Sequence, residues 1–109
     1  MTQQYDWLVQ VPDKPNALQT RMSNLASHLS YNKPHIEAGK LVFTGPTLSS
    51  QPKSADEVPA MTGTVTLFKA ETEDEVWEMV KGNPFAEVGV WDLEKATVTP
   101  FRCAVRKAL

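Results

Sequence analysis

The sequence predicts one ferredoxin-like α+β domain with the element order β-α-β-β-α-β. Four short apolar runs are typical of strands, and two longer segments repeat apolar residues at helical spacing. A chain of 109 residues has room for one modest core, so we treat residues 1–109 as a single domain. This element order gives an antiparallel sheet with both helices on one face.

The first strand is predicted over Tyr5–Val11 and ends at the proline that follows. Asn16 can cap the helix after it, and Gly39 is a natural C-terminal stop. We expect Pro34 to kink this helix or to break it just before that residue. Its apolar residues fall on one stripe, the pattern of a helix face that packs on a core, and they are Leu18, Met22, Leu25, Leu29 and Ile36.

The middle of the chain alternates two strands with a loop. Leu41–Thr44 is predicted as a short strand that ends at Gly45. Residues 47–60 carry Ser, Pro and charged side chains without periodicity, so we expect a long and flexible loop there. Met61–Ala70 follows as another strand.

The last third contains a helix and a final strand. Thr72 and Glu75 match a capping box, and the helix that they begin should end near Gly82. Residues 83–89 are predicted to be irregular, and residues 90–101 to form the last strand. Pro100 confines that strand to a sheet edge or its own end. Residues 102–109 are predicted to be a C-terminal tail.

Composition excludes several classes of protein. The net charge of −2 and the pI near 5.6 give no basic footprint, so nucleic-acid binding is not expected. The single cysteine, Cys103, permits no intrachain disulfide and no cysteine-based zinc site. No run approaches the roughly 20 apolar residues that span a bilayer, and residues 1–6 lack the pattern of a signal peptide. We therefore expect a cytoplasmic protein without a membrane partner.

The strands also suggest how the protein associates. Several of them carry apolar residues on both faces, while the helices can cover only one face of the sheet. Covering the second face with the same face of another subunit is the economical solution. The sequence therefore predicts a homodimer through the sheet face.

Three side chains on the first helix form a possible site. Arg21, His28 and His35 are seven residues apart in turn, so they line up along the helix, about 10 Å between neighbours. That distance is too long for the two histidines to share a metal ion directly, and no metal site is expected. His28 is the best single candidate for acid–base chemistry, although its position alone favours a polar residue that caps the helix or hydrogen-bonds locally. Trp91 could line a cleft, but its position favours packing in the core.

The order of several short motifs resembles the YciI-like (YCII-related) family, in a variant similar to its fungal members. The motifs run from about Tyr5 to Arg102, and they are Arg21 to Leu29, Glu37–Leu41, Thr44–Pro46, Thr62–Thr64, Thr72–Val80, Asn83–Phe85, Gly89–Asp92 and Pro100–Phe101. The resemblance implies a dimeric α/β barrel with a cleft between the first helix, the sheet and the Asn83 segment. It also implies a histidine paired with an aspartate. His28 matches that histidine, whereas Asn83 stands where the family usually has aspartate.

This resemblance leads to a functional hypothesis. We expect a cofactor-free lyase or isomerase whose substrate is a cyclic or aromatic small molecule. His28 would be the general acid/base, Asn83 would orient it, and Arg21 would hold an anionic oxygen, while Phe85 and Trp91 would wall the pocket. The alternative is a non-catalytic small-molecule-binding or accessory module on the same fold. Because asparagine supplies no negative charge to an imidazolium, the sequence leaves both open.

Overall fold

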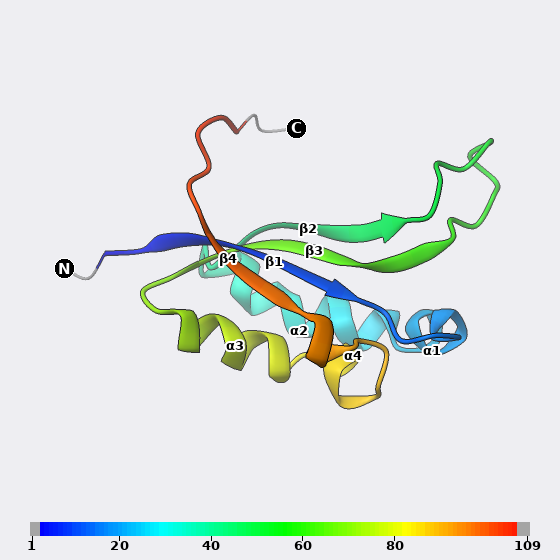
Figure 1. Cartoon of the computed structure of the whole chain (residues 1–109), viewed down its shortest axis with the longest axis horizontal. Helices are drawn as coiled ribbons and strands as arrows, with labels where there is room; N and C mark the ends of the chain where they lie inside the picture. The colour runs from blue at the N-terminus through cyan, green and yellow to red at the C-terminus, as the bar shows by residue number, and fades with distance from the viewer. Residues whose placement is uncertain (1–2, 107–109) are drawn as a thin grey trace.

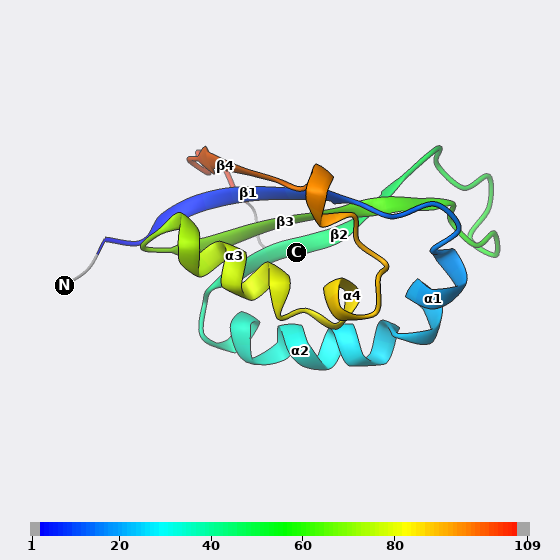
Figure 2. The same cartoon turned by 60° about the horizontal axis from the view of Figure 1, so that its bottom comes forward.

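The fold is built on a four-stranded antiparallel sheet in which the strands lie in the order β2-β3-β1-β4. In this computed structural model, which describes residues 3–106, all the helices lie against one face of the sheet (Figures 1 and 2). The predicted ferredoxin-like α+β fold is confirmed. Its elements are β1 (Tyr5–Pro12), α1 (Leu18–Ser23), α2 (Leu25–Glu37), β2 (Leu41–Leu48), β3 (Met61–Ala70), α3 (Glu73–Lys81), α4 (Pro84–Glu87), the 3₁₀ turn η1 (Leu93–Lys95) and β4 (Thr97–Phe101).

Some sequence-based expectations extend to residues outside the described range. The predicted tail is described only for residues 102–106, and residues 1–2 and 107–109 lie outside it. Within the described part of the chain, no helix is both long and apolar enough to cross a membrane.

Two strands differ from the sequence-based bounds. β2 continues through Gly45 and Pro46 to Leu48, so it includes the first two residues of the predicted 47–60 loop. β4 begins at Thr97 instead of at residue 90, because η1 interrupts the extended chain. Trp91 forms only an isolated bridge with Asp13. Pro100 lies in β4, which is an edge strand as predicted.

The first helical segment also differs from the prediction. Asn16 has a φ of 61°, a left-handed conformation that asparagine tolerates, and Ala17 is the N-cap residue of α1 without a side-chain hydrogen bond. The segment breaks at Asn24, between α1 and α2, while α2 continues through Pro34. Gly39 ends it as predicted, with a φ of 74° and its N–H bound to the carbonyl of Ile36.

The second half follows its local sequence signals more closely. The hydroxyl of Thr72 accepts a hydrogen bond from the Glu75 N–H at 3.3 Å, and α3 ends at Lys81, just before Gly82. Residues 83–89, predicted to be irregular, contain the helical turn α4. Asn83 caps that turn, because its Oδ1 accepts the N–H of Phe85 at 2.9 Å. This cap fixes the direction of the Asn83 amide.

The two parts of the helical layer bury different kinds of side chain. Under α3 and α4 lies the apolar core, which includes Val9, Phe68, Val76, Val80 and Phe85. By contrast, the apolar stripe predicted for the first helix is between 38% and 57% exposed, so its assignment to the core was wrong. The residues of α1 and α2 that are buried are Arg21, His28 and Asn32. Burying polar side chains costs free energy unless they find hydrogen-bond partners. A functional site is therefore expected in the half of the molecule under α1 and α2.

Gly63 provides a test of how closely the site strand approaches β1. A Cβ atom at residue 63 would lie 2.5 Å from the carbonyl oxygen of Val11 and 3.0 Å from Cα of Pro12, whereas one at Gly45 would meet nothing within 4 Å. We expect Gly63→Ala to lower the free energy of unfolding by about 1–3 kcal/mol, because backbone must shift. Gly45→Ala, the matched control, should change it by less than about 0.5 kcal/mol. Urea unfolding of both variants measures this, and equal stabilities would contradict the close approach.

Candidate functional site

The buried polar side chains gather in one region between α1, α2, α4 and the sheet. They are Arg21, His28, Asn32, Thr64, Thr66 and Asn83. Burying a polar group without a partner costs roughly 1–3 kcal/mol in proteins, and burying an unpaired charge costs more. A small domain that places six such residues together therefore carries a built site there, and its hydrogen bonds define what the site can do.

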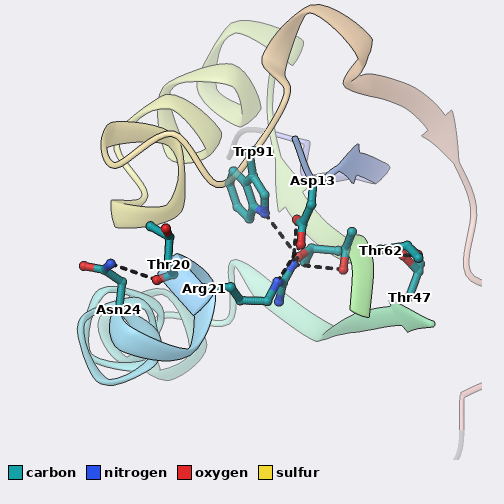
Figure 3. Close-up of polar contacts among 9 residues, drawn as sticks. Asp13, Thr20, Arg21, Asn24, Thr47, Thr62 and Trp91 are labelled. Carbon is teal, nitrogen blue, oxygen red and sulfur yellow. Dashed lines mark hydrogen bonds and ion pairs between the residues drawn. The ribbon is translucent and has the colours of Figure 1, made fainter. Parts of the chain in front are cut away.

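Arg21 connects α1 to two strands. Its Nε donates to Asp13 Oδ2 at 2.9 Å, and its Nη2 donates to Asp13 Oδ1 at 3.0 Å. Nη2 also lies 2.9 Å from the Gly63 carbonyl oxygen and 2.6 Å from Thr64 Oγ1, so its two hydrogens are shared among three acceptors. Figure 3 shows Arg21 reaching from its helix towards Asp13, with Trp91 next to them. Because the two side chains are 4% and 6% exposed, the guanidinium is held by a buried carboxylate.

His28 is held by Asn83, the N-cap residue of α4. Its Nδ1 lies 2.9 Å from Asn83 Oδ1, the same oxygen that accepts the Phe85 N–H. An amide oxygen is only an acceptor, so His28 Nδ1 must be the donor in this bond. The backbone N–H of Phe85 fixes which end of the Asn83 amide is the oxygen. The neutral His28 ring therefore carries its proton on Nδ1 and a lone pair on Nε2.

Asn32 closes a ring of hydrogen bonds around this histidine. Asn83 Nδ2 donates to Asn32 Oδ1 at 3.4 Å, and Asn32 Nδ2 lies 3.3 Å from His28 Nε2. Since the nitrogen of Asn32 can only donate, it contacts the Nε2 lone pair. Both distances exceed 3.2 Å, so these two bonds are weaker than the one between His28 and Asn83. His28 Nε2 is therefore the basic atom of the site, and its lone pair is engaged only by the long hydrogen bond from Asn32.

The surroundings of His28 favour its neutral form. Burial lowers the pKa of His28 below its usual value, and the positive charge of Arg21 lowers it further, while the hydrogen bond to Asn83 acts in the opposite direction. The ring stacks on Phe85 with centroids 4.0 Å apart and planes 8° apart. Trp91 meets the same ring edge-on at 6.1 Å. These two aromatic side chains fix the plane of the imidazole.

A cavity of about 260 Å³ opens beside His28, Arg21 and Thr64. Its other lining residues come from α2, β2 and β3 and are mostly apolar, namely Leu25, Leu29, Thr44, Gly45, Pro46 and Met61. A larger hollow of about 400 Å³, lined by Gln10, Val65 and Thr97 among others, has no histidine in its wall. The smaller cavity therefore combines a titratable group with an apolar lining, the usual composition of a small-molecule site.

The five residues proposed from the sequence lie together. Asn83 lies within hydrogen-bonding distance of His28, and Phe85 and Trp91 pack against the imidazole. The apolar walls of the cavity come instead from Leu25, Leu29, Pro46 and Met61. His35 is partly buried against Tyr31, with ring centroids 5.0 Å apart, and does not line this cavity.

Sequence reasoning missed three partners in the site, namely Asp13, Asn32 and Thr64. Asn32 follows His28 by four residues, a spacing that places two side chains on the same helix face and was available as a signal. Asp13 and Thr64 become neighbours of Arg21 only through the pairing of β1 with β3. Among residues 3–106, no group of three or more His, Cys, Asp or Glu side chains is placed to hold a metal ion.

The chain is similar to known fungal proteins over most of its length. The chain is 44% identical to the xenovulene A biosynthesis cluster protein asL2 of Sarocladium schorii, over 95% of this chain and 93% of that protein. It is 45% identical to the derivative of benzaldehyde biosynthesis cluster protein C of Emericella nidulans, over 82% of this chain and 91% of that protein.

A solved structure is similar over nearly the same length. It is the 5-chloro-2-hydroxyhydroquinone dehydrochlorinase TftG of Burkholderia phenoliruptrix in complex with 2,5-dihydroxybenzoquinone. It superposes with a TM-score of 0.75 at 32% identity, covering 89% of this chain and 93% of that one. Residues 6–102 match the YCII-related domain. The chain therefore belongs to the YCII-related family, as its motifs predict.

Proposed function

We propose that the protein is a lyase or isomerase that moves a proton on a cyclic, aromatic or enol-bearing small molecule, with His28 as its general acid/base. The observation that carries this proposal is the neutral, buried His28, whose Nδ1 is held by Asn83 beside a mostly apolar cavity. The similar dehydrochlorinase, crystallised with a dihydroxybenzoquinone, supports a substrate of this shape. The fungal biosynthesis cluster relatives support a role in making a secondary metabolite.

The proton step follows from the hydrogen bonds of the site. A substrate in the cavity displaces the long Asn32 contact, and His28 Nε2 accepts a proton from a carbon or hydroxyl of the substrate. The electron pair left behind is delocalised into the substrate's ring or carbonyl oxygen. Returning the proton at another position gives isomerisation, and loss of a leaving group gives elimination. His28 carries this chemistry without a cofactor, and Asn83 keeps the imidazole in one tautomer throughout.

A non-catalytic binding or accessory module is the second candidate. It is favoured by one observation, the Asn32 amide that contacts Nε2 and occupies the basic lone pair. Asn83 also offers no negative charge to stabilise an imidazolium. In that case the cavity would bind a small molecule, and substitution of His28 would change affinity without any turnover to lose.

We propose further that the protein is a homodimer through the open face of the sheet. Phe43 of β2, Leu67 of β3 and Leu8 of β1 are neighbours in register and form one apolar row across this face. Leu67 is completely buried although it lies outside the core under the helices, while Phe43 is 45% exposed. No helix within residues 3–106 covers this face (Figure 2). A second copy of the same face would bury the row.

His28→Ala should remove catalysis. We expect at least about a hundredfold loss of rate, which is the usual contribution of a general base. Chloride release from 5-chloro-2-hydroxyhydroquinone and exchange of the ring hydrogens of 2,5-dihydroxybenzoquinone in D₂O are the readouts. His35→Ala changes the other histidine of the chain and is the matched control, with unchanged rates expected. Wild-type rates in the His28 variant would sink the assignment, and binding without turnover in the wild type would favour the second candidate.

Asn83→Asp should raise the pKa of His28. Both oxygens of an aspartate accept hydrogen bonds, so Asn32 can turn and offer Oδ1 to a protonated Nε2, and the added charge stabilises the imidazolium. In the wild type, burial holds the pKa of His28 below the usual value for a histidine, so the base form persists at pH values where an ordinary histidine is protonated. Titration of the His28 Cε1–H signal by NMR measures both proteins, with His35 as the internal control. A lower midpoint in the variant would contradict the hydrogen-bond scheme.

Phe43→Glu should separate the dimer. The side chain is already half exposed in the single chain, so a charge there costs little until a second copy covers it. Light scattering during size exclusion should give the dimer mass for the wild type and the monomer mass for the variant. Val58→Glu, at a 63% exposed apolar residue in the loop after β2, is the matched control. A wild type that is monomeric at all concentrations refutes the proposal.

A further inference from the structure

We propose that Thr64 is a ligand-binding residue whose hydroxyl can only donate, and that it selects ligands with a carbonyl-type oxygen. This inference rests on the proposed function only in placing the ligand in the cavity beside His28. It adds the group that recognises one end of that ligand.

Both lone pairs of Thr64 Oγ1 are already engaged. Arg21 Nη2 donates to this oxygen at 2.6 Å, and Trp91 Nε1 donates to it at 3.2 Å. Neither an arginine guanidinium nor an indole N–H can reverse its role. A hydroxyl has two lone pairs and one hydrogen, so the hydrogen of Thr64 must find an acceptor elsewhere. Among residues 3–106, no hydrogen bond donated by this hydroxyl is found.

The free hydrogen belongs to a residue of the cavity wall. Thr64 is 4% exposed and lines the cavity together with Arg21 and His28. The Nη1 group of Arg21 adds a second donor, because the described hydrogen bonds of this side chain use only Nε and Nη2. A buried donor that lacks a partner favours a ligand that supplies an acceptor, since leaving the donor unpaired is costly. This end of the cavity is therefore built for an oxygen that accepts hydrogen bonds.

The charges of Arg21 and Asp13 indicate which type of ligand oxygen this end of the cavity favours. Asp13 lies 2.9–3.0 Å from the guanidinium and neutralises it, so the cavity does not present an unpaired cation. A carboxylate ligand would approach the negative Asp13 as well as the positive Arg21. A neutral carbonyl oxygen of a quinone or conjugated ketone meets the same donors without that repulsion. The oxygen of a ligand hydroxyl can also accept this bond, but its own hydrogen then finds no acceptor on Thr64, because Thr64 Oγ1 already accepts two hydrogen bonds.

Three probes of similar shape test the selection. We would titrate the protein with 4-hydroxyacetophenone, 4-ethylphenol and 4-hydroxybenzoate at pH 7 and follow the indole N–H signal of Trp91 by NMR, assigned with Trp91→Phe. Because one hydrogen bond changes affinity by roughly two- to tenfold, the ketone should bind at least about threefold more tightly than either other probe. Thr64→Val should reduce its preference over 4-ethylphenol to about one, and Thr64→Ser should keep it.

Thr66→Val is the matched control, because it removes a buried hydroxyl two residues along the same strand from a residue that does not line the cavity itself, although it also breaks the 2.8 Å hydrogen bond to the lining residue Thr44. It should keep the preference. If Thr64→Val does not fold, Thr64→Ala replaces it, and if neither folds, the wild-type preference alone decides. Equal binding of the three probes by the wild type, no Trp91 shift with any probe, or a preference that survives loss of the hydroxyl would overturn the proposal. Turnover in the His28 variant tests the proposed function separately, so the two can fail independently.

Discussion

The buried contact between Arg21 and Asp13 is the constraint on which the site geometry depends. It joins α1 to the chain that follows β1, and the same guanidinium reaches the Gly63 carbonyl and Thr64 on β3. Removing one partner of such a buried pair generally costs about 3–5 kcal/mol, because the other charge is then left without compensation. The position of α1 against the sheet is thus set by directional bonds as well as by apolar contact. These bonds also fix the positions of Arg21 and Thr64 in the wall of the adjoining cavity.

The space between the helices and the sheet has an apolar part and a polar part. The part under α3 and α4 is apolar and close-packed, and this part supplies the burial that holds the fold together. The part under α1 and α2 is lined by polar side chains that hydrogen-bond to one another, with Phe85 at the boundary contacting both His28 and Arg21. Such an arrangement lets one small domain keep a stable core and a desolvated histidine side by side.

Local signals in the sequence were sufficient for much of the fold. Alternating apolar residues identified the strand at Met61–Ala70, and the Thr72 cap identified the start of α3, because both depend on neighbours within a few residues. The inner face of α1 and α2 could not be identified in this way. Hydrophobic periodicity assumes that a helix buries its apolar stripe, whereas here polar side chains are turned inward and bond to Asn83 and to β3. The family motif placed His28 and Asn83 in one cleft, but Thr64 enters only through strand pairing and hydrogen-bond geometry.

Asn83 Oδ1 accepts two hydrogen bonds, one that caps α4 and one that orients His28. Aspartate can meet both demands with the same side-chain length, since it is an equally good helix cap. In the genetic code, asparagine and aspartate codons differ by a single base. A lineage can therefore exchange charge for neutrality beside the histidine in one mutational step, without passing through a misfolded intermediate. A substitution at residue 83 can therefore change the chemistry beside His28 while the helix cap and the fold stay the same.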